Sequence, residues 1–347
     1  MKINDLSRRK FITACSAFSV LPMVSSALSA TSAIAPDKAA ARLNDKDNTK
    51  GLNFGMFICW SFSTFSDREW TRGIKDLSIF QPTGLDTDQW CRVAKEAGMD
   101  YILFLTKHHD GFALWDTQTT SWKVTNSVLQ RDVLKELQKS CKKYELKLAL
   151  YFSEGDWTWI PQDLNPEDFV KPEKYWWMGR SSELKKAQLK ELCTNYGPIA
   201  YFWMDHAQSD GGLSHTETAA WVKKFQPDCL VGFNHGEVAG DIRLGEMGKP
   251  GPLDSAEGGG PYNKVVHKDF KRAEFTYPIL GKGGRWFYTS PKNDGEALNP
   301  EKIYEDYKGA IKYNNLFALD VGPDREGKLR DIDVKVLQQV GKLIRGR

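Results

Sequence analysis

The stretch Tyr196-Gly-Pro-Ile-Ala-Tyr-Phe-Trp-Met-Asp205-His206 predicts a buried strand that ends on a carboxylate. An apolar run at 199–204 forms the expected strand, and Asp205 follows it directly. Barrel enzymes build their active sites at the carboxyl ends of such strands, which favours a catalytic Asp205. The same residue could instead cap the next helix, and the stretch by itself leaves both interpretations open.

Apolar strands and amphipathic helices alternate on both sides of this stretch. Further strands are expected at 54–60, 101–106, 146–153 and 229–235. Helices are expected at 86–98, 133–143, 182–196 and 216–225. This alternation predicts a parallel sheet covered by helices. No Gly-x-Gly-x-x-Gly or P-loop motif follows a strand, so the pattern disfavours a nucleotide-binding sheet and favours a (β/α)8-type TIM barrel.

The second half of the chain has a less regular pattern. Residues 236–262 are rich in glycine and proline and are expected to form one long loop. The sixth, seventh and eighth strands are expected at 274–280, 286–289 and 316–321. Helices are expected at 300–313 and 331–344. One catalytic barrel would then occupy residues 51–347, with an irregular second half.

The first thirty residues predict a signal peptide rather than part of the fold. Ser7-Arg-Arg-Lys-Phe-Ile12 is a twin-arginine pattern, and an uncharged run with small residues follows it. We expect residues 1–30 to direct export and residues 31–50 to form a linker. The expected location is therefore the periplasm of a bacterium or the medium outside it.

Charge and cysteine content exclude several classes of partner. Residues 1–30 contain Lys2, Arg8, Arg9 and Lys10 against Asp5, a net +3 that equals the net charge of the whole chain. The rest is formally neutral, so no nucleic-acid partner is expected, and no later apolar run is long enough to span a membrane. The five remaining cysteines lack a short Cys-x-x-Cys spacing, which is typical of buried thiols rather than of a zinc site.

The expected strand ends carry polar and aromatic side chains that a parallel barrel would bring to one face. They are Cys59, Trp60, His108, His109, Tyr151, Ser153, Trp203, Asp205, His206, Asn234 and His235. A single histidine at a strand end is more often structural. Four of the six histidines at such positions are harder to explain by chance. Aromatic residues make up 12% of the chain and offer surfaces that could pack against sugar rings.

Adjacent histidines in Lys107-His-His-Asp-Gly111 could suggest a metal site. Neighbouring residues of a strand point to opposite faces, so His108 and His109 are not expected to chelate one ion. No metal and no other cofactor is expected.

Short segments along the chain are more specific than the strand pattern. They are Phe54-Gly-Met-Phe-Ile-Cys-Trp60, Glu69-Trp70, Leu85-Asp-Thr-Asp-Gln-Trp-Cys-Arg-Val-Ala-Lys-Glu-Ala-Gly98, Thr106-Lys-His-His-Asp-Gly-Phe112, Leu114-Trp-Asp116, Arg131-Asp-Val-Leu-Lys-Glu136 and Phe202-Trp-Met-Asp205. Over about residues 51–344 the chain thereby resembles the α-L-fucosidases of glycoside hydrolase family 29. The resemblance implies a retaining exo-glycosidase on a (β/α)8-type barrel, with a fucosylated glycan or oligosaccharide as its partner.

The resemblance also implies roles for individual residues. Asp205 falls on the position of the nucleophile. Glu246 and Glu274 are both candidates for the acid/base, and Glu246 is slightly favoured because it lies in a loop that could fold over the pocket. The expected substrate-binding residues are Cys59, Trp60, Glu69, Trp70, His108, His109, Tyr151, Trp203, His206, His235 and Trp286.

Two departures from the family pattern lie in the expected sugar pocket. Cys59 stands where typical relatives have histidine, and Asn234-His235 stand where many have arginine. The β-sandwich that often follows the family's barrel has no counterpart in the expected elements. These departures leave open a related α-L-glycosidase such as an α-L-galactosidase, or a catalytically weak sugar-binding protein on the same barrel. A metal-dependent hydrolase is a more distant alternative, and the oligomeric state is left open.

Overall fold

The computed structural model describes residues 49–71, 73–74, 76–159, 181–206, 213–234, 240–253, 270–280, 285–289 and 295–346. The expected signal peptide at 1–30, nearly all of the expected linker at 31–50 and the candidate residue His235 lie outside these residues. None of the described helices combines the length and the apolar character that crossing a membrane requires.

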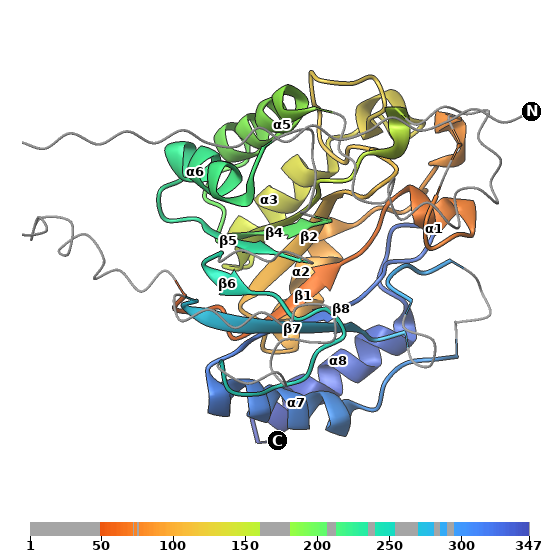
Figure 1. The fold of residues 1–347 in the computed structure, drawn as a ribbon. Helices are drawn as coiled ribbons and strands as arrows, with labels where there is room; N and C mark the ends of the chain where they lie inside the picture. Colours follow the sequence, from red (N-terminus) through yellow and green to blue (C-terminus); the bar gives the residue numbers. More distant parts are fainter. Residues whose placement is uncertain are drawn as a thin grey trace, which may run out of the picture. The chain divides into compact units, whose positions relative to one another are not determined.

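Parallel strands close into a barrel in sequence order, which confirms the expected (β/α)8-type fold (Figure 1). The strands of the described residues are β1 (Phe54–Ile58), β2 (Tyr101–Lys107), β3 (Lys147–Ser153), β4 (Tyr201–Asp205), β5 (Leu230–Phe233), β6 (Ile242–Arg243), β7 (Arg272–Pro278) and β8 (Leu316–Asp320). β1 pairs with both β2 and β8, and this second pairing closes the sheet. The stretch around Asp205 is therefore the fourth strand of the barrel.

Helices cover the outside of the barrel. The longer ones are α2 (Thr87–Glu96), α3 (Val133–Lys143), α5 (Ser182–Asn195), α6 (His215–Phe225), α7 (Pro300–Tyr313) and α8 (Asp331–Ile344). Shorter turns are α1 (Phe62–Ser66), η2 (Leu77–Ile79), η3 (Val124–Asn126) and η4 (Trp157–Trp159). Most of the longer helices start with an N-cap residue whose side chain accepts a hydrogen bond from a backbone N–H of the first turn. These caps are Asp86, Asp132, Ser181, Ser214 and Asn299.

The second half of the barrel differs from the sequence-based expectation in two strands. β6 lies at Ile242–Arg243, inside the segment that was expected to be one long loop. The segment expected to be the sixth strand is β7, and residues 286–289, expected to be the seventh, form no strand. β6 has only two residues and pairs through Ile242 with Gly232 and Arg272. So short a strand has no hydrophobic periodicity from which it could be recognised.

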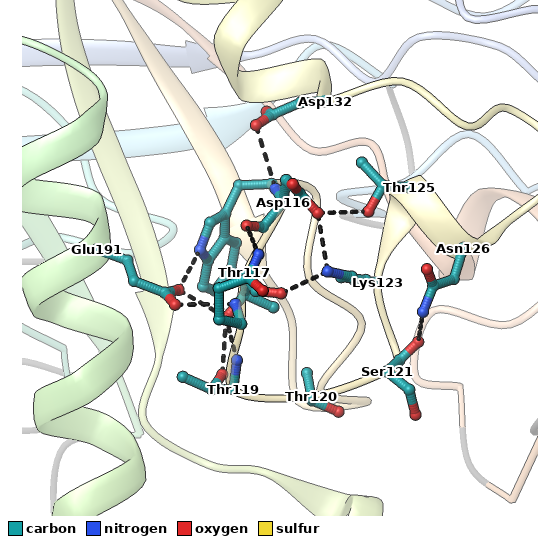
Figure 2. Close-up of polar contacts among 12 residues, drawn as sticks. Asp116, Thr117, Thr119, Thr120, Ser121, Lys123, Thr125, Asn126, Asp132 and Glu191 are labelled. Carbon is teal, nitrogen blue, oxygen red and sulfur yellow. Dashed lines mark hydrogen bonds and ion pairs between the residues drawn. The ribbon is translucent and has the colours of Figure 1, made fainter.

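The long loop between β2 and α3 is fixed by hydrogen bonds to carboxylates (Figure 2). Glu191 of α5 accepts hydrogen bonds from Trp115 Nε1 at 2.9 Å, Thr117 Oγ1 at 2.6 Å and the backbone N–H of Gln118 at 2.9 Å. Asp116 in the same loop accepts from Lys123 Nζ and Thr125 Oγ1, both at 2.8 Å. These contacts anchor the loop that carries His108 and His109 at its start.

The beginning of this loop packs tightly on the segment after β3. Gly111 has a φ of 74°, in the left-handed region that favours glycine. A Cβ at this position would lie 2.6 Å from the side chain of Thr158 and 2.7 Å from that of Asp156. The backbone N–H of Trp157 donates to the carbonyl of His109 at 2.7 Å. Glycine is thus required here, and the contact holds His109 against the end of β3.

Candidate active site

Asp205 ends β4 with its carboxylate held by three hydrogen-bond donors. Tyr151 Oη donates to Oδ2 at 2.6 Å, and Asn234 Nδ2 donates to Oδ1 at 2.9 Å. The backbone N–H of His206 also donates to Oδ1 at 2.9 Å. The next described helix, α6, is capped by Ser214 instead. Asp205 therefore does not cap that helix and is a carboxylate oriented by donors from three neighbouring strand ends.

Glu246 follows β6 and lies close to Asp205. Asn234 Nδ2, which donates to Asp205, also donates to Glu246 Oε2 at 2.7 Å. The amide nitrogen has two hydrogens, so it can serve both carboxyl groups at once. Since the two hydrogen bonds measure 2.9 and 2.7 Å, Asp205 Oδ1 and Glu246 Oε2 are at most 5.6 Å apart.

Glu274, the other acid/base candidate, occupies a different place. It lies within β7, is fully buried and does not line the cavity that Asp205 and Glu246 share. Its Oε2 accepts hydrogen bonds from Trp203 Nε1 at 3.4 Å and from the backbone N–H of Gly245 at 3.2 Å. Burial raises the pKa of Glu274 to about 8. Its carboxyl supports the wall residue Trp203 from within the barrel.

This buried carboxyl makes stability depend on pH. Its pKa is about 8 in the folded protein against 4.5 for an ordinary glutamate, so the unfolded chain releases the proton first. Folding stability therefore decreases as pH rises from about 4.5 towards 8. We expect Glu274→Gln to reduce the fall in melting temperature between pH 5 and pH 8 by about 3 °C or more. Thermal unfolding followed by circular dichroism at both pH values measures this.

A matched control is Glu145→Gln, because the Glu145 side chain is 87% exposed. This variant makes the same Glu→Gln substitution at an exposed site and should follow the wild-type pH dependence. If Glu274→Gln also follows it, Glu274 has no elevated pKa in the folded protein.

A cavity of about 240 Å³ lies at the carboxyl ends of the strands. It is lined by Phe57, Cys59, Trp70, Leu105, His108, His109, Tyr151, Trp203, Asp205, His206, Glu246, Trp286 and Phe287. Its aromatic side chains pack on one another: Tyr151 stacks on Trp203 with ring centroids 5.3 Å apart, and Phe57 contacts both rings. The cavity thus has two carboxyl groups, three histidines and a largely aromatic wall.

Trp60 and Glu69 do not line this cavity. Trp60 is fully buried, packs edge-on against Phe80 and Trp90, and donates from Nε1 to the carbonyl of Asp324 at 2.9 Å. The structure places it in the core, so the expectation that it contacts the substrate is not met. Glu69 accepts a hydrogen bond from the backbone N–H of Trp286 at 2.8 Å, and burial raises its pKa to about 7. It supports the cavity wall through Trp286.

The histidines lie closer together than strand geometry suggested. The rings of His108 and His109 are 3.9 Å apart, and those of His109 and His206 are 4.0 Å apart. The expectation that His108 and His109 point to opposite faces was wrong because β2 ends at Lys107 and both residues follow it. Burial lowers the pKa of His108 to about 3, so this imidazole is neutral.

The proton on one nitrogen of His109 can be assigned from its neighbours. Ser153 Oγ donates its only hydrogen to the carbonyl of Gly155 at 2.9 Å. It must then accept the hydrogen bond that joins it to His109 Nδ1 at 2.7 Å. This arrangement directs Nε2 towards Asp205 Oδ2, 3.8 Å away.

One group of side chains at this site has the spacing of metal ligands. Potential ligand atoms of His109, Asp205 and His206 lie within 4.8 Å of one another. Histidine nitrogens and a carboxylate are common ligands of divalent transition metals. Both oxygens of Asp205 also accept hydrogen bonds, so the same carboxylate is suited to a role without metal.

Cys59 lines the cavity at the end of β1. It is almost fully buried, and burial together with the nearby carboxylate of Asp320 raises the pKa of its thiol well above the usual value. Cys59, noted above as a departure from the family pattern, therefore places a small neutral group in the cavity. Asp320 and Asn234 were not assigned roles from the sequence, although both lie at strand ends where polar residues are informative.

Glycoside hydrolases commonly cleave their substrates with a pair of carboxyl groups that flank the scissile bond. Asp205 and Glu246 place two carboxyl groups close together at the face where TIM-barrel enzymes place their chemistry. This fold and this arrangement of carboxyl groups are typical of barrel glycoside hydrolases.

Within this class the chain belongs to the α-L-fucosidase family, whose model matches residues 42–346. It is 28% identical to α-L-fucosidase 1 of Arabidopsis thaliana over 318 residues, which cover 84% of this chain and 58% of that protein. The chain therefore spans less than two thirds of the length of this curated relative.

Solved structures of bacterial proteins share the fold. α-L-Fucosidase isoenzyme 1 from Paenibacillus thiaminolyticus aligns with a TM-score of 0.69 and 25% identity, over 86% of this chain and 75% of that one. A putative α-L-fucosidase from Bacteroides ovatus aligns with a TM-score of 0.66 and 26% identity, over 85% of this chain and 54% of that one. These similarities agree with the closed parallel barrel.

Proposed function

We propose that this protein is a retaining exo-α-L-fucosidase that removes terminal fucose from a glycan or oligosaccharide. The proposal rests on the bridge that Asn234 forms between Asp205 and Glu246, which limits the distance from Asp205 Oδ1 to Glu246 Oε2 to 5.6 Å. Retaining glycosidases hold their carboxyl groups about 5–5.5 Å apart, and inverting ones about 6.5–9.5 Å apart. Membership of the α-L-fucosidase family supports the choice of sugar.

In the proposed mechanism Asp205 attacks the anomeric carbon while Glu246 protonates the glycosidic oxygen. The bond between sugar and leaving group breaks, and a fucosyl ester of Asp205 forms. Glu246, now ionised, removes a proton from water as the water attacks the anomeric carbon. Fucose leaves with its original configuration, and both carboxyl groups return to their starting states.

Neighbouring groups support this division of roles. Tyr151 and Asn234 donate hydrogen bonds to the two oxygens of Asp205, which favours and orients its ionised form. Burial and the charge of Asp205 raise the pKa of Tyr151 well above its usual value, so Tyr151 stays a neutral donor. The aromatic wall of Tyr151, Trp203 and Phe57 offers apolar surface to a deoxysugar.

Proton NMR of the hydrolysis of an aryl α-L-fucoside tests the proposal directly. The α anomer of fucose should form first and then mutarotate to the equilibrium mixture. Appearance of the β anomer first would mean that the enzyme inverts. Fucose binding detected by calorimetry without turnover of any α-L-fucoside would instead indicate a sugar-binding protein on the same barrel.

A metal-dependent hydrolase is the second candidate, because His109, Asp205 and His206 have the spacing of metal ligands. We expect exhaustive dialysis against EDTA to leave kcat/KM for an aryl α-L-fucoside unchanged within about twofold, because the proposed double displacement needs only the two carboxyl groups. Elemental analysis of the dialysed protein verifies that metal has been removed. Loss of activity that returns on addition of Zn²⁺ would favour the metal-dependent mechanism.

A further inference from the structure

Four large apolar side chains are substantially exposed among the described residues: Trp70 (47%), Val128 (59%), Met247 (42%) and Ile311 (48%). One of them lines the cavity, and a second is next to a residue that does. Trp70 lines the cavity, and Met247 directly follows the cavity residue Glu246. Ile311 lies on α7, and Val128 lies on the loop between β2 and α3.

The backbone at Met247 is unfavourable for the residue that occupies it. Met247 has a φ of 52°, in the left-handed region that residues with a Cβ rarely adopt. The backbone N–H of Gly248 donates to the carbonyl of Gly245 at 2.9 Å, which closes a turn with Glu246 and Met247 at its centre. Glycine or asparagine is the usual residue where the second central position of a turn has positive φ.

Neither the turn nor the core accounts for a methionine at this position. Glycine would adopt the observed φ with less strain, and a side chain that is 42% exposed contributes little to the core. Strained residues that the fold does not require are concentrated at functional sites. Met247 lies in the same turn as Glu246, the proposed proton donor, so its function is sought beside that residue.

In the proposed reaction Glu246 gives its proton to the oxygen that joins fucose to the leaving group. The leaving group therefore lies beside Glu246. A thioether packs well on aromatic rings, and tryptophan packs on aromatic rings and on the C–H faces of sugars. Met247, which directly follows Glu246 and is 42% exposed, offers such a surface.

We propose that Met247 contributes to the leaving-group subsite and determines specificity for leaving groups with an apolar face, such as an aromatic ring or the C–H face of a second sugar. This inference rests on the proposed fucosidase function. It assigns Met247 to contacts with the leaving group and not to the binding of fucose.

Two substrates that differ only in the leaving group separate these contacts from the rest of catalysis. Aryl α-L-fucosides carry a large aromatic leaving group, and α-L-fucosyl fluoride carries a single atom. Met247→Gly should lower the ratio of kcat/KM for the aryl fucoside to kcat/KM for the fluoride about 10-fold, as expected for loss of one apolar contact. The fold should survive because glycine readily adopts positive φ.

Gln130→Gly is a matched control. Gln130 is also exposed and left-handed, with a φ of 51°, and it does not line the cavity. This variant should leave the ratio unchanged. An equal loss on both substrates for Met247→Gly, or no loss on either, would overturn the inference and leave the proposed function standing. Failure of the wild-type protein to hydrolyse either fucoside would overturn the proposed function, and the inference with it.

Discussion

Asp205→Asn is expected to lower kcat for an aryl α-L-fucoside by about 10⁴-fold, as removal of a nucleophile commonly does. The amide has nearly the same shape as the carboxylate, so its oxygen can still accept from Asn234 and its NH2 can donate to Tyr151 Oη. It has no negative charge to attack the anomeric carbon or to stabilise an oxocarbenium-like transition state. Steady-state kinetics measure the loss, and a circular dichroism melt shows whether the barrel is intact.

Asp306→Asn provides a matched control for this experiment. Asp306 on α7 accepts a hydrogen bond from Tyr277 Oη at 2.7 Å, much as Asp205 accepts one from Tyr151 at 2.6 Å. The same substitution there changes a tyrosine–aspartate pair that does not line the cavity. It should keep the wild-type rate. If Asp205→Asn also kept it, Asp205 would not be the nucleophile.

Most elements of the barrel could be predicted because their signals are local. The helices at 133–143, 300–313 and 331–344 begin and end where the apolar spacing indicated. β6 could not be predicted in this way, because its two residues are a strand only through pairing with β5 and β7. That pairing depends on contacts between distant parts of the chain, which local composition does not contain.

The candidate site was predictable to the extent that strand ends converge on one face. Asp205, His108, His109, Tyr151 and Trp203 all line the cavity, as that geometry requires. The prediction failed for residues just beyond a strand end, because there the direction of the side chain decides whether the residue lines the cavity. Cys59 enters the cavity and its neighbour Trp60 enters the core. The sequence alone does not specify which of two adjacent residues faces which side.

The choice between Glu246 and Glu274 also depended on spatial contacts. Glu246 follows the sixth strand and Glu274 lies in the seventh, so the two are close in the fold. Asn234 distinguishes them, because its amide joins Glu246 to Asp205 while Glu274 lies behind Trp203. A substitution at each glutamate can test this assignment.

Glu246→Gln is expected to lower kcat/KM by about 10²–10⁴-fold for a fucoside with a poor leaving group such as phenol, because loss of a general acid has effects of this size. For 2,4-dinitrophenyl α-L-fucoside, whose leaving group needs no proton, the loss in kcat/KM should be much smaller. Glu274→Gln should change kcat/KM for both substrates by no more than about threefold, because its carboxyl does not line the cavity.

Rescue by azide separates the acid/base from other roles. In Glu246→Gly the removed side chain leaves space beside the fucosyl ester of Asp205, and azide can attack without help from a base. The product should be α-L-fucosyl azide, which keeps the configuration of the substrate because two displacements have occurred. Rescue of Glu274→Gly, or a large loss for the phenyl fucoside in Glu274→Gln with none in Glu246→Gln, would transfer the acid/base role to Glu274. The bridge through Asn234 would then link Asp205 to a residue that does not carry the proton.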